Sequence, residues 1–230
     1  LLDGHTQILS FPLYLRIDDN FIQMLNEENP EKLAKKFINF FPEFFNSKIN
    51  KFERHHRLGK NRNKHFKVNK KKFIRSFVNL NKSKKLDNFN KLKFLHYAYS
   101  ISKGEILKKK KILFIHTHLV SWTQKFVREV KPINYEIIHI IRHPLASLSS
   151  PIKNWLNFDS GKNFFPRNLY FQIDLVFKGI FDLMKINKVK IIQYEYLHWK
   201  HKKVMNDFCK IYNIKFEKCL NTCTKNGLIW

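Results

Sequence analysis

Hydrophobic residues recur at helical spacing through the first half of the chain. Between residues 18 and 48 this spacing is carried by Phe21, Ile22, Leu25, Leu33, Phe37, Phe40 and Phe41. Pro30 divides the stretch into two predicted helices, because proline interrupts a helix interior but suits a helix start, and Pro42 is expected to end or kink the second. The spacing resumes over residues 72–80 and 86–102, and Gly104 is expected to close the second of these helices. The polar, basic residues 51–70 predict a surface loop with little regular structure.

The second half has a different hydrophobic pattern, in which short apolar runs alternate with stretches of helical spacing. Three runs have the β-branched composition of buried strands: residues 111–116, 136–141 and 189–193. Helical spacing occupies residues 122–130, 145–157, 166–187 and 199–212. This alternation predicts an α/β fold with parallel strands, in which ligands bind at the carboxyl ends of the strands. A further short strand is expected at residues 7–11, and residues 221–230 are expected to form a loop.

Composition limits the class of protein. A chain of 230 residues with 43% hydrophobic content suits a single globular domain over residues 1–230. The net charge of +26 favours an anionic ligand. Most of the excess is lysine, accompanied by abundant Asn, Ile and Phe, so AT-rich codon usage can explain much of it. The lysine runs 70–72 and 108–111 are therefore predicted to be solvated faces.

Cysteine content and hydropathy indicate the cellular compartment in which the protein resides. Cys209, Cys219 and Cys223 match neither a disulfide framework nor a zinc-ligand spacing. No apolar run approaches the roughly 20 residues that cross a bilayer. The sequence also contains no signal segment. These features predict a protein of the cytoplasm, a reducing compartment.

The strand at residues 136–141 runs directly into Arg142, His143 and Pro144, and a helix is predicted from Leu145 onward. Pro144 suits a helix start, because its missing N–H would be unpaired there in any case. Free backbone N–H groups, the helix dipole and a guanidinium then converge on one spot. The turn predicts an anion site, although a capping or surface arginine would look the same.

Ser150 follows Arg142 by eight positions, and this segment resembles the 3′-phosphate-binding segment of sulfotransferases that use 3′-phosphoadenosine 5′-phosphosulfate. In that family, the arginine and the serine hold the 3′-phosphate of the co-substrate. His143 departs from the pattern, because the family often has an acidic or amide residue there. A serine in such a cluster can also cap or back-bond within its own helix.

Three further segments resemble the same family in the expected order. Residues 189–197, VKIIQYEYL, resemble the late strand that ends in Tyr-Glu-Asp-Leu, with Tyr196 in place of the aspartate. Tyr194 could stack on adenine or pack as a strand aromatic. Asn226 and Gly227 resemble the start of the loop that covers the cofactor, and residues 1–12 resemble the segment after the phosphosulfate-binding loop.

Residues 114–119, FIHTHL, resemble the Lys-Thr-His-Leu stretch of one sulfotransferase branch, in which the histidine is the general base. By position this residue is His118, and an imidazole that titrates near neutrality can deprotonate a hydroxyl. The alternative is a hydrogen-bonded histidine at a strand end. His116 and His118 could also form a metal pair, but no third ligand follows at a recognisable spacing, so no metal is expected.

The resemblance implies a P-loop-NTPase-like three-layer α/β domain with a central parallel sheet, incomplete at both ends. The phosphosulfate loop, of Pro-x-Ser-Gly-Thr-Thr type, does not occur in residues 1–230 and is expected before Leu1. The chain is therefore expected to be an inactive fragment that retains weak affinity for 3′-phosphorylated adenosine.

The implied reaction moves a sulfuryl group to a hydroxyl or amine on a small-molecule, glycan or lipid acceptor. Residues 48–110, the part least like the family, are expected to form a helical and loop insertion that shapes the acceptor site. One alternative is a basic nucleic-acid-binding module, although the aromatic residues fall at core spacing. The other is a small-molecule kinase, which would need a Walker-type loop and magnesium-binding acids.

Overall fold

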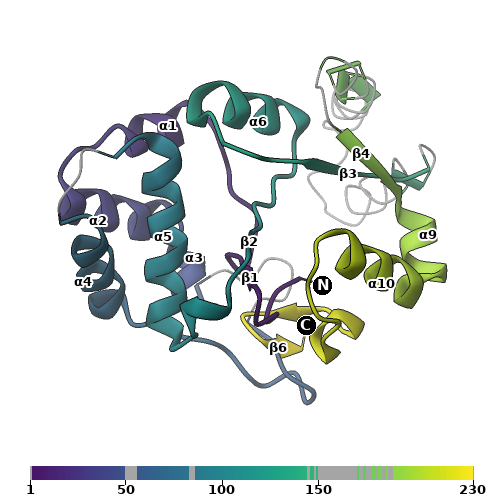
Figure 1. Ribbon diagram of the computed structural model, residues 1–230, viewed down its shortest axis with the longest axis horizontal. Helices are drawn as coiled ribbons and strands as arrows, with labels where there is room; N and C mark the ends of the chain where they lie inside the picture. The colour runs from purple at the N-terminus through teal and green to yellow at the C-terminus, as the bar shows by residue number, and fades with distance from the viewer. Residues whose placement is uncertain are drawn as a thin grey trace, which may run out of the picture.

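The computed structural model describes residues 2–49, 56–82, 86–143 and 189–229, with residues 146, 147, 149, 170, 173, 174, 178, 179, 181, 182 and 185. Helices from the first half of the chain gather on one side, and short strands with two C-terminal helices lie on the other (Figure 1). The predicted helices at residues 145–157 and 166–187 lie almost wholly outside the described residues. No helix among the described residues is long and apolar enough to cross a membrane.

The helical side contains five helices of the described chain: α1 (Asp19–Leu25), α2 (Pro30–Phe40), α3 (Pro42–Phe45), α4 (Lys70–Leu80) and α5 (Asn88–Lys103). The predicted boundary at Pro30 is confirmed, since Pro30 begins α2 behind an Asn29 cap that accepts from the N–H of Lys32. Gly104 ends α5 in the left-handed conformation, at φ 84°. The expected end of the second helix at Pro42 is confirmed, since α2 ends at Phe40 and Pro42 begins the short helix α3.

Phenylalanine dominates the core of this helical side. Phe21, Phe37, Phe44, Phe45, Phe73 and Phe77 are fully buried there. Tyr99 of α5 is buried among them, and its hydroxyl donates to the carbonyl of Phe44 at 2.6 Å. Helices α4 and α5, within the predicted insertion, therefore belong to the main core. Residues 56–69 contain no helix or strand and are mostly exposed, as predicted for a surface loop, but Leu58, Phe66 and Val68 are buried in the same core.

The described strands form three two-stranded sheets. β1 (Ile8–Leu9) pairs in parallel with β2 (Ile112–Leu113), and β3 (Ile137–Ile141) pairs in parallel with β4 (Val189–Gln193). The prediction of parallel strands in a mixed α/β fold is confirmed. The strand pairs are short, and no continuous central sheet joins them within the described residues.

One helix covers both parallel pairs. α10 (His201–Ile211) follows α9 (Tyr194–Trp199) and buries Val204, Met205, Phe208 and Cys209. Ile8 and Ile112 of the first pair pack in this cluster, as do Ile138 and Ile192 of the second. Residues of both strand pairs therefore pack against the same helix.

The last residues form a hairpin, which corrects the prediction of a loop. β5 (Thr224–Lys225) pairs antiparallel with β6 (Leu228–Ile229). Asn226 and Gly227 link them at φ 53° and 78°, the left-handed conformations that a tight hairpin turn requires. Short helical turns complete the described chain: η2 (Leu107–Lys109), α6 (Val120–Lys125), the π-helical η3 (Phe126–Val130) and η5 (Lys218–Asn221).

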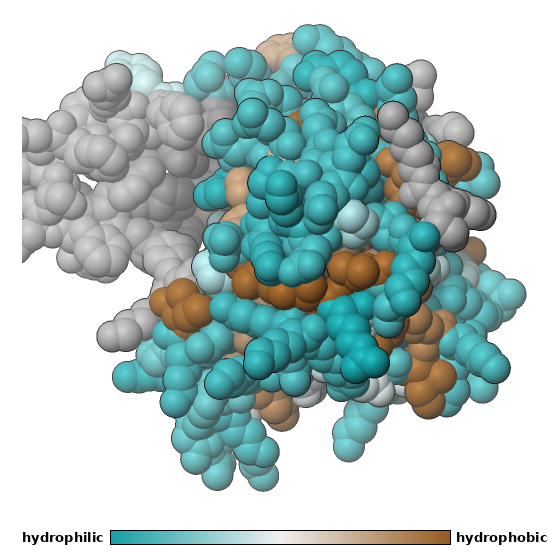
Figure 2. All heavy atoms as spheres, turned by 90° about the vertical axis from the view of Figure 1, so that its left-hand side faces the viewer, coloured by the Kyte–Doolittle hydropathy of each residue, from teal (hydrophilic) through white to brown (hydrophobic). Residues whose placement is uncertain are grey.

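The outer face of the helical side is mainly hydrophilic and is crossed by a narrow hydrophobic band (Figure 2). Lysines 70–72, at the start of α4, are exposed as the sequence predicts. The run 108–111 departs from that prediction at Lys110, whose side chain is only 4% exposed and pairs with Glu105.

Candidate functional site

The carboxyl ends of β3 and β4 bring two of the predicted site residues together. The register pairs Ile141 with Gln193, so the next residues, Arg142 and Tyr194, both follow the carboxyl end of the strand pair. The guanidinium carbon of Arg142 lies 5.2 Å from the centre of the Tyr194 ring, within the range of a cation–π contact. Parallel pairing therefore places a cation and an aromatic ring together at the carboxyl end of the two strands.

Arg142 is exposed and can face a ligand. Its guanidinium makes no hydrogen bond within the part of the chain that the structure describes, so its N–H donors remain for an anionic group. Tyr194 also contacts His198, one turn later on α9, with the ring centres 4.5 Å apart. Contacts with Arg142 and His198 favour Tyr194 as a support for the guanidinium rather than as an open stacking surface. Ser150, the second predicted phosphate ligand, lies outside the described residues.

A carboxylate also belongs to this site. Oε1 of Glu195 accepts from the backbone N–H of His143 at 3.1 Å. This hydrogen bond is the main cause that lowers the pKa of Glu195, and the positive charge of Arg142 adds to it. The other oxygen, Oε2, is buried and has no hydrogen-bond partner among the described residues. Glu195 was not predicted as a site residue, because its contact with His143 depends on the pairing and register of β3 and β4.

His118 lies beyond the end of β2, in a segment fixed by three contacts. The backbone N–H of Leu15 donates to the carbonyl of His116 at 2.7 Å. The hydroxyls of Thr117 and Thr123 lie 2.6 Å apart. The ring of His118 stacks on Tyr14, with centres 3.6 Å apart. β1 and β2 are parallel, so the segments that carry Tyr14 and His118 leave the same strand edge.

An aromatic group therefore surrounds this exposed histidine. Trp122 of α6 lies on Tyr14 at 6.1 Å with nearly parallel rings, and His116 contacts His118 at 5.0 Å. His118 and the Arg142–Tyr194 pair thus lie at the ends of different strand pairs. Tyr14 was not predicted, because only the parallel pairing of β1 with β2 brings it to His118.

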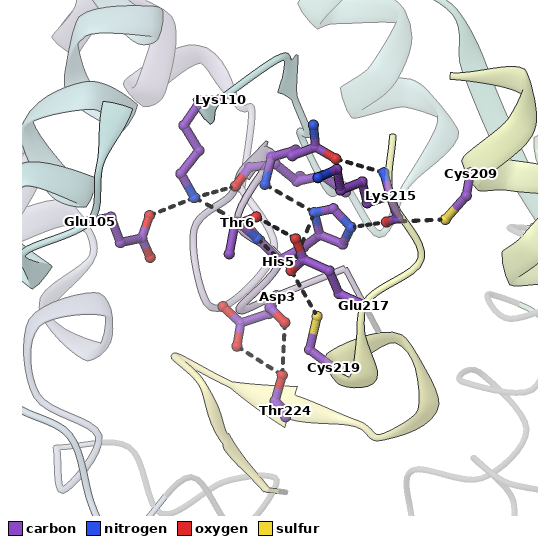
Figure 3. A network of polar contacts seen from close by, with 12 residues as sticks. Asp3, His5, Thr6, Glu105, Lys110, Cys209, Lys215, Glu217, Cys219 and Thr224 are labelled. Atoms are coloured by element: carbon purple, nitrogen blue, oxygen red, sulfur yellow. Dashed lines mark hydrogen bonds and ion pairs between the residues drawn. The ribbon is translucent and has the colours of Figure 1, made fainter. Parts of the chain in front are cut away.

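Gly227 and Thr224 of the C-terminal hairpin contact the N-terminal segment. The N–H of Gly227 donates to Oδ2 of Asp3 at 2.8 Å. The Thr224 hydroxyl donates to the same side chain at 3.2 Å (Figure 3). Asp3 is buried. These contacts join the two ends of the described chain and give Asn226 and Gly227 a structural place in a hairpin.

The same region holds a polar network around His5 (Figure 3). Nδ1 of His5 accepts from the N–H of Gln7 at 3.0 Å, so Nε2 carries the proton and donates to the carbonyl of Lys215 at 2.8 Å. Glu217 accepts from both the N–H and the hydroxyl of Thr6. Both ring nitrogens of His5 make hydrogen bonds to the backbone. We therefore interpret this polar network as a structural contact between the N-terminal segment and residues 215–217.

The cysteines and acidic residues assemble no metal centre among the described residues, where no group of three or more potential ligands occurs. Cys209, Cys219 and Cys223 are free thiols. No protein-family profile, curated protein or solved structure matches the chain. What the described residues define is a mixed α/β protein, with short parallel strand pairs and an arginine–tyrosine pair at a strand edge.

Proposed function

We propose that this chain binds a 3′-phosphorylated adenosine nucleotide at Arg142, as part of a sulfotransferase that uses 3′-phosphoadenosine 5′-phosphosulfate. The observation that carries the proposal is the position of Arg142 at the carboxyl ends of two adjacent parallel strands, with its guanidinium oriented by Tyr194. This edge is where α/β folds bind their ligands.

The residues present fit a phosphate group. The guanidinium is exposed, makes no hydrogen bond to another described residue and can form charge-assisted hydrogen bonds to two oxygens of one phosphate. The ring of Tyr194 restricts the guanidinium before the ligand binds, which lowers the entropy lost on binding. Glu195 opposes an anion by its charge, and it occupies the N–H of His143. The proposed site therefore recognises phosphate chiefly through the side chain of Arg142.

In this proposal His118 takes the proton of an acceptor hydroxyl or amine. Its support comes from the fixed strand-end segment and from the stacked Tyr14, which orients the imidazole. An acceptor with an aromatic or sugar ring would find neighbouring rings at Tyr14 and Trp122.

The test is a calorimetric titration of the chain with adenosine 3′,5′-bisphosphate and, in parallel, with AMP. One charge-assisted contact to the 3′-phosphate predicts roughly 10- to 100-fold tighter binding of the bisphosphate. Arg142→Ala should abolish this preference, and Arg142→Lys should keep only part of it, because an ammonium cannot bind two phosphate oxygens as a fork. Binding is the appropriate readout, because the phosphosulfate loop does not occur within residues 1–230.

Arg128→Ala is the matched control. Arg128 is also exposed, but it pairs with Glu129 on η3 and should leave the preference unchanged. Equal affinity of the unaltered chain for the two nucleotides would contradict the 3′-phosphate site. A loss of preference in both arginine variants would assign the effect to net charge.

A further inference from the structure

The corner between α9 and α10 exposes a large aromatic side chain among lysines. Trp199, the last residue of α9, is 80% exposed, the highest value among the large hydrophobic residues of the described chain. Lys200, Lys202 and Lys203 follow it directly, and all three are exposed. None of these lysines forms an ion pair within the described part of the chain. Asp207 is the only acidic residue on α10.

The inner side of the same corner is firmly held. Leu197 is buried two residues before Trp199, and Val204 and Met205 are buried just after the lysines. The ring of His201 contacts the carbonyl of Leu220 at 2.5 Å, and the N–H of Lys200 donates to the carbonyl of Tyr196 at 2.9 Å. The indole therefore points away from a corner whose backbone is fixed by the core, and the exposure of Trp199 does not come from missing packing.

We propose that this corner, Trp199 with Lys200, Lys202 and Lys203, docks the protein on the surface of a membrane that contains anionic lipids. An indole is favoured at the level of the lipid headgroups, where its apolar ring and its N–H both find suitable surroundings. Lysines next to it are attracted to anionic headgroups, each by roughly fivefold in affinity. The protein lies on the membrane in this mode and does not span it. The inference is independent of the proposed nucleotide site.

The shape of the corner favours a lipid surface over a nucleic acid. α9 and α10 meet at an edge of the molecule, on the side away from α2 and α4 (Figure 1). A projecting corner meets a flat surface, whereas single-stranded nucleic acid is bound in basic grooves lined by successive stacking rings. Tyr196, three residues before Trp199 and 40% exposed, adds a second interfacial aromatic on the same side of α9.

The experiment is co-sedimentation of the chain with vesicles of phosphatidylcholine alone and of phosphatidylcholine with about 30% phosphatidylserine, at low and at high salt. The proposal predicts binding to the anionic vesicles, weakened by salt because screening shortens the reach of the lysine charges. Lys200→Glu with Lys202→Glu and Lys203→Glu should weaken binding by roughly 100-fold or more. Trp199→Ala should weaken it roughly tenfold, and Trp199→Phe less.

The matched control is the triple variant Lys70→Glu, Lys71→Glu and Lys72→Glu, which changes the net charge equally at three exposed lysines of α4. It should bind vesicles nearly as the unaltered chain does. Equal losses in the two triple variants would overturn the proposal, because only the overall charge would matter. Binding unaffected by Trp199→Ala would also overturn it. Binding to a thymidine oligonucleotide but not to vesicles, lost in the corner variant, would assign the corner to nucleic acid instead.

Discussion

The carboxylate of Glu195 accepts a hydrogen bond from the backbone N–H of His143, at 3.1 Å, across the ends of two parallel strands. The contact links the residue after Tyr194 to the residue after Arg142. It therefore holds together the two segments that position the guanidinium. It also places a negative charge beside Arg142, the residue proposed to bind phosphate. Holding the segments together favours anion binding, whereas the negative charge opposes it.

Two substitutions of Glu195 separate these effects. Glu195→Gln keeps an oxygen that can accept from His143 and removes the charge, so it should bind adenosine 3′,5′-bisphosphate roughly two- to fivefold more tightly than the unaltered chain. Glu195→Ala removes the hydrogen bond as well and should bind roughly fivefold more weakly than Glu195→Gln. Calorimetric titration measures both, with Glu129→Gln as the control for a lost surface charge. Equal affinity of the two Glu195 variants would show that the hydrogen bond does not position the site.

Lys110 is a second side chain whose role depends on tertiary structure. Its ammonium donates to the carbonyls of His5 and Ile8 at 3.2 and 2.7 Å and pairs with Glu105 at 2.8 Å (Figure 3). Lys110→Met removes a buried cation and leaves the carbonyl of Ile8 without this donor. His5 and Glu105 each lose one of their donors. It should lower the free energy of unfolding by about 3 kcal/mol.

Urea unfolding followed by circular dichroism measures that loss. Lys109→Met is the control, because Lys109 lies next to Lys110 in the same lysine run and is exposed. A change below about 0.5 kcal/mol in both variants would show that Lys110 behaves as an ordinary surface lysine.

Lys110 also shows where prediction from the sequence stops. Local signals gave the helix starts at Pro30, the helix end at Gly104 and the strand at residues 189–193, because proline, glycine and β-branched runs act through neighbouring residues. Four lysines in a row carry no such signal. Which of them is buried depends on carbonyls about one hundred residues earlier in the chain.

The candidate site also has features that the sequence predicts and features that depend on tertiary structure. Arg142 and Tyr194 could be placed at strand ends from the sequence, because each follows a strand-like run directly. Their contact, the carboxylate of Glu195 and the stacking of Tyr14 on His118 depend on which strands pair and in what register. The Asn226-Gly227 turn was overlooked for another reason. The flanking strands have only two residues each, too short for an alternating pattern to show.

Asp3 should stabilise the contact between the two ends of the described chain. Its buried carboxylate accepts from the N–H of Gly227 and the hydroxyl of Thr224. Asp3→Ala should lower the free energy of unfolding by about 2 kcal/mol, because it leaves the N–H of Gly227 without an acceptor. The Thr224 hydroxyl still donates to the backbone carbonyl of residue 3 in this variant. Asp207→Ala, at an exposed position of α10, should change it by less than about 0.5 kcal/mol. Denaturant titration of the two variants checks the difference, and equal effects would show that the hydrogen bonds of Asp3 add no stability.

His96 should make the stability of the fold depend on pH. Its ring is fully buried against Phe11, with centres 3.8 Å apart, and its Nδ1 contacts the carbonyl of Leu92 at 3.0 Å. Burial lowers the pKa of His96 to about 3, whereas an unfolded histidine titrates near 6.5. Between these two values the unfolded chain binds a proton that the folded chain does not bind. The stability from a neutral His96 is therefore complete above about pH 6.5 and is lost as the pH falls, by about 1.4 kcal/mol per pH unit.

His96→Gln tests this dependence, because glutamine keeps an amide that can donate to Leu92 and has no titrating group. The variant should be less stable than the unaltered chain at pH 7.5, because it loses the ring contact with Phe11. Its free energy of unfolding should fall less steeply between pH 6.5 and 4.5, by up to about 1.4 kcal/mol per pH unit. Urea unfolding at several pH values measures both slopes, and His65→Gln, at an exposed position, should leave the slope unchanged. Parallel slopes for the unaltered chain and His96→Gln would mean that His96 binds its proton equally well in the folded and unfolded states.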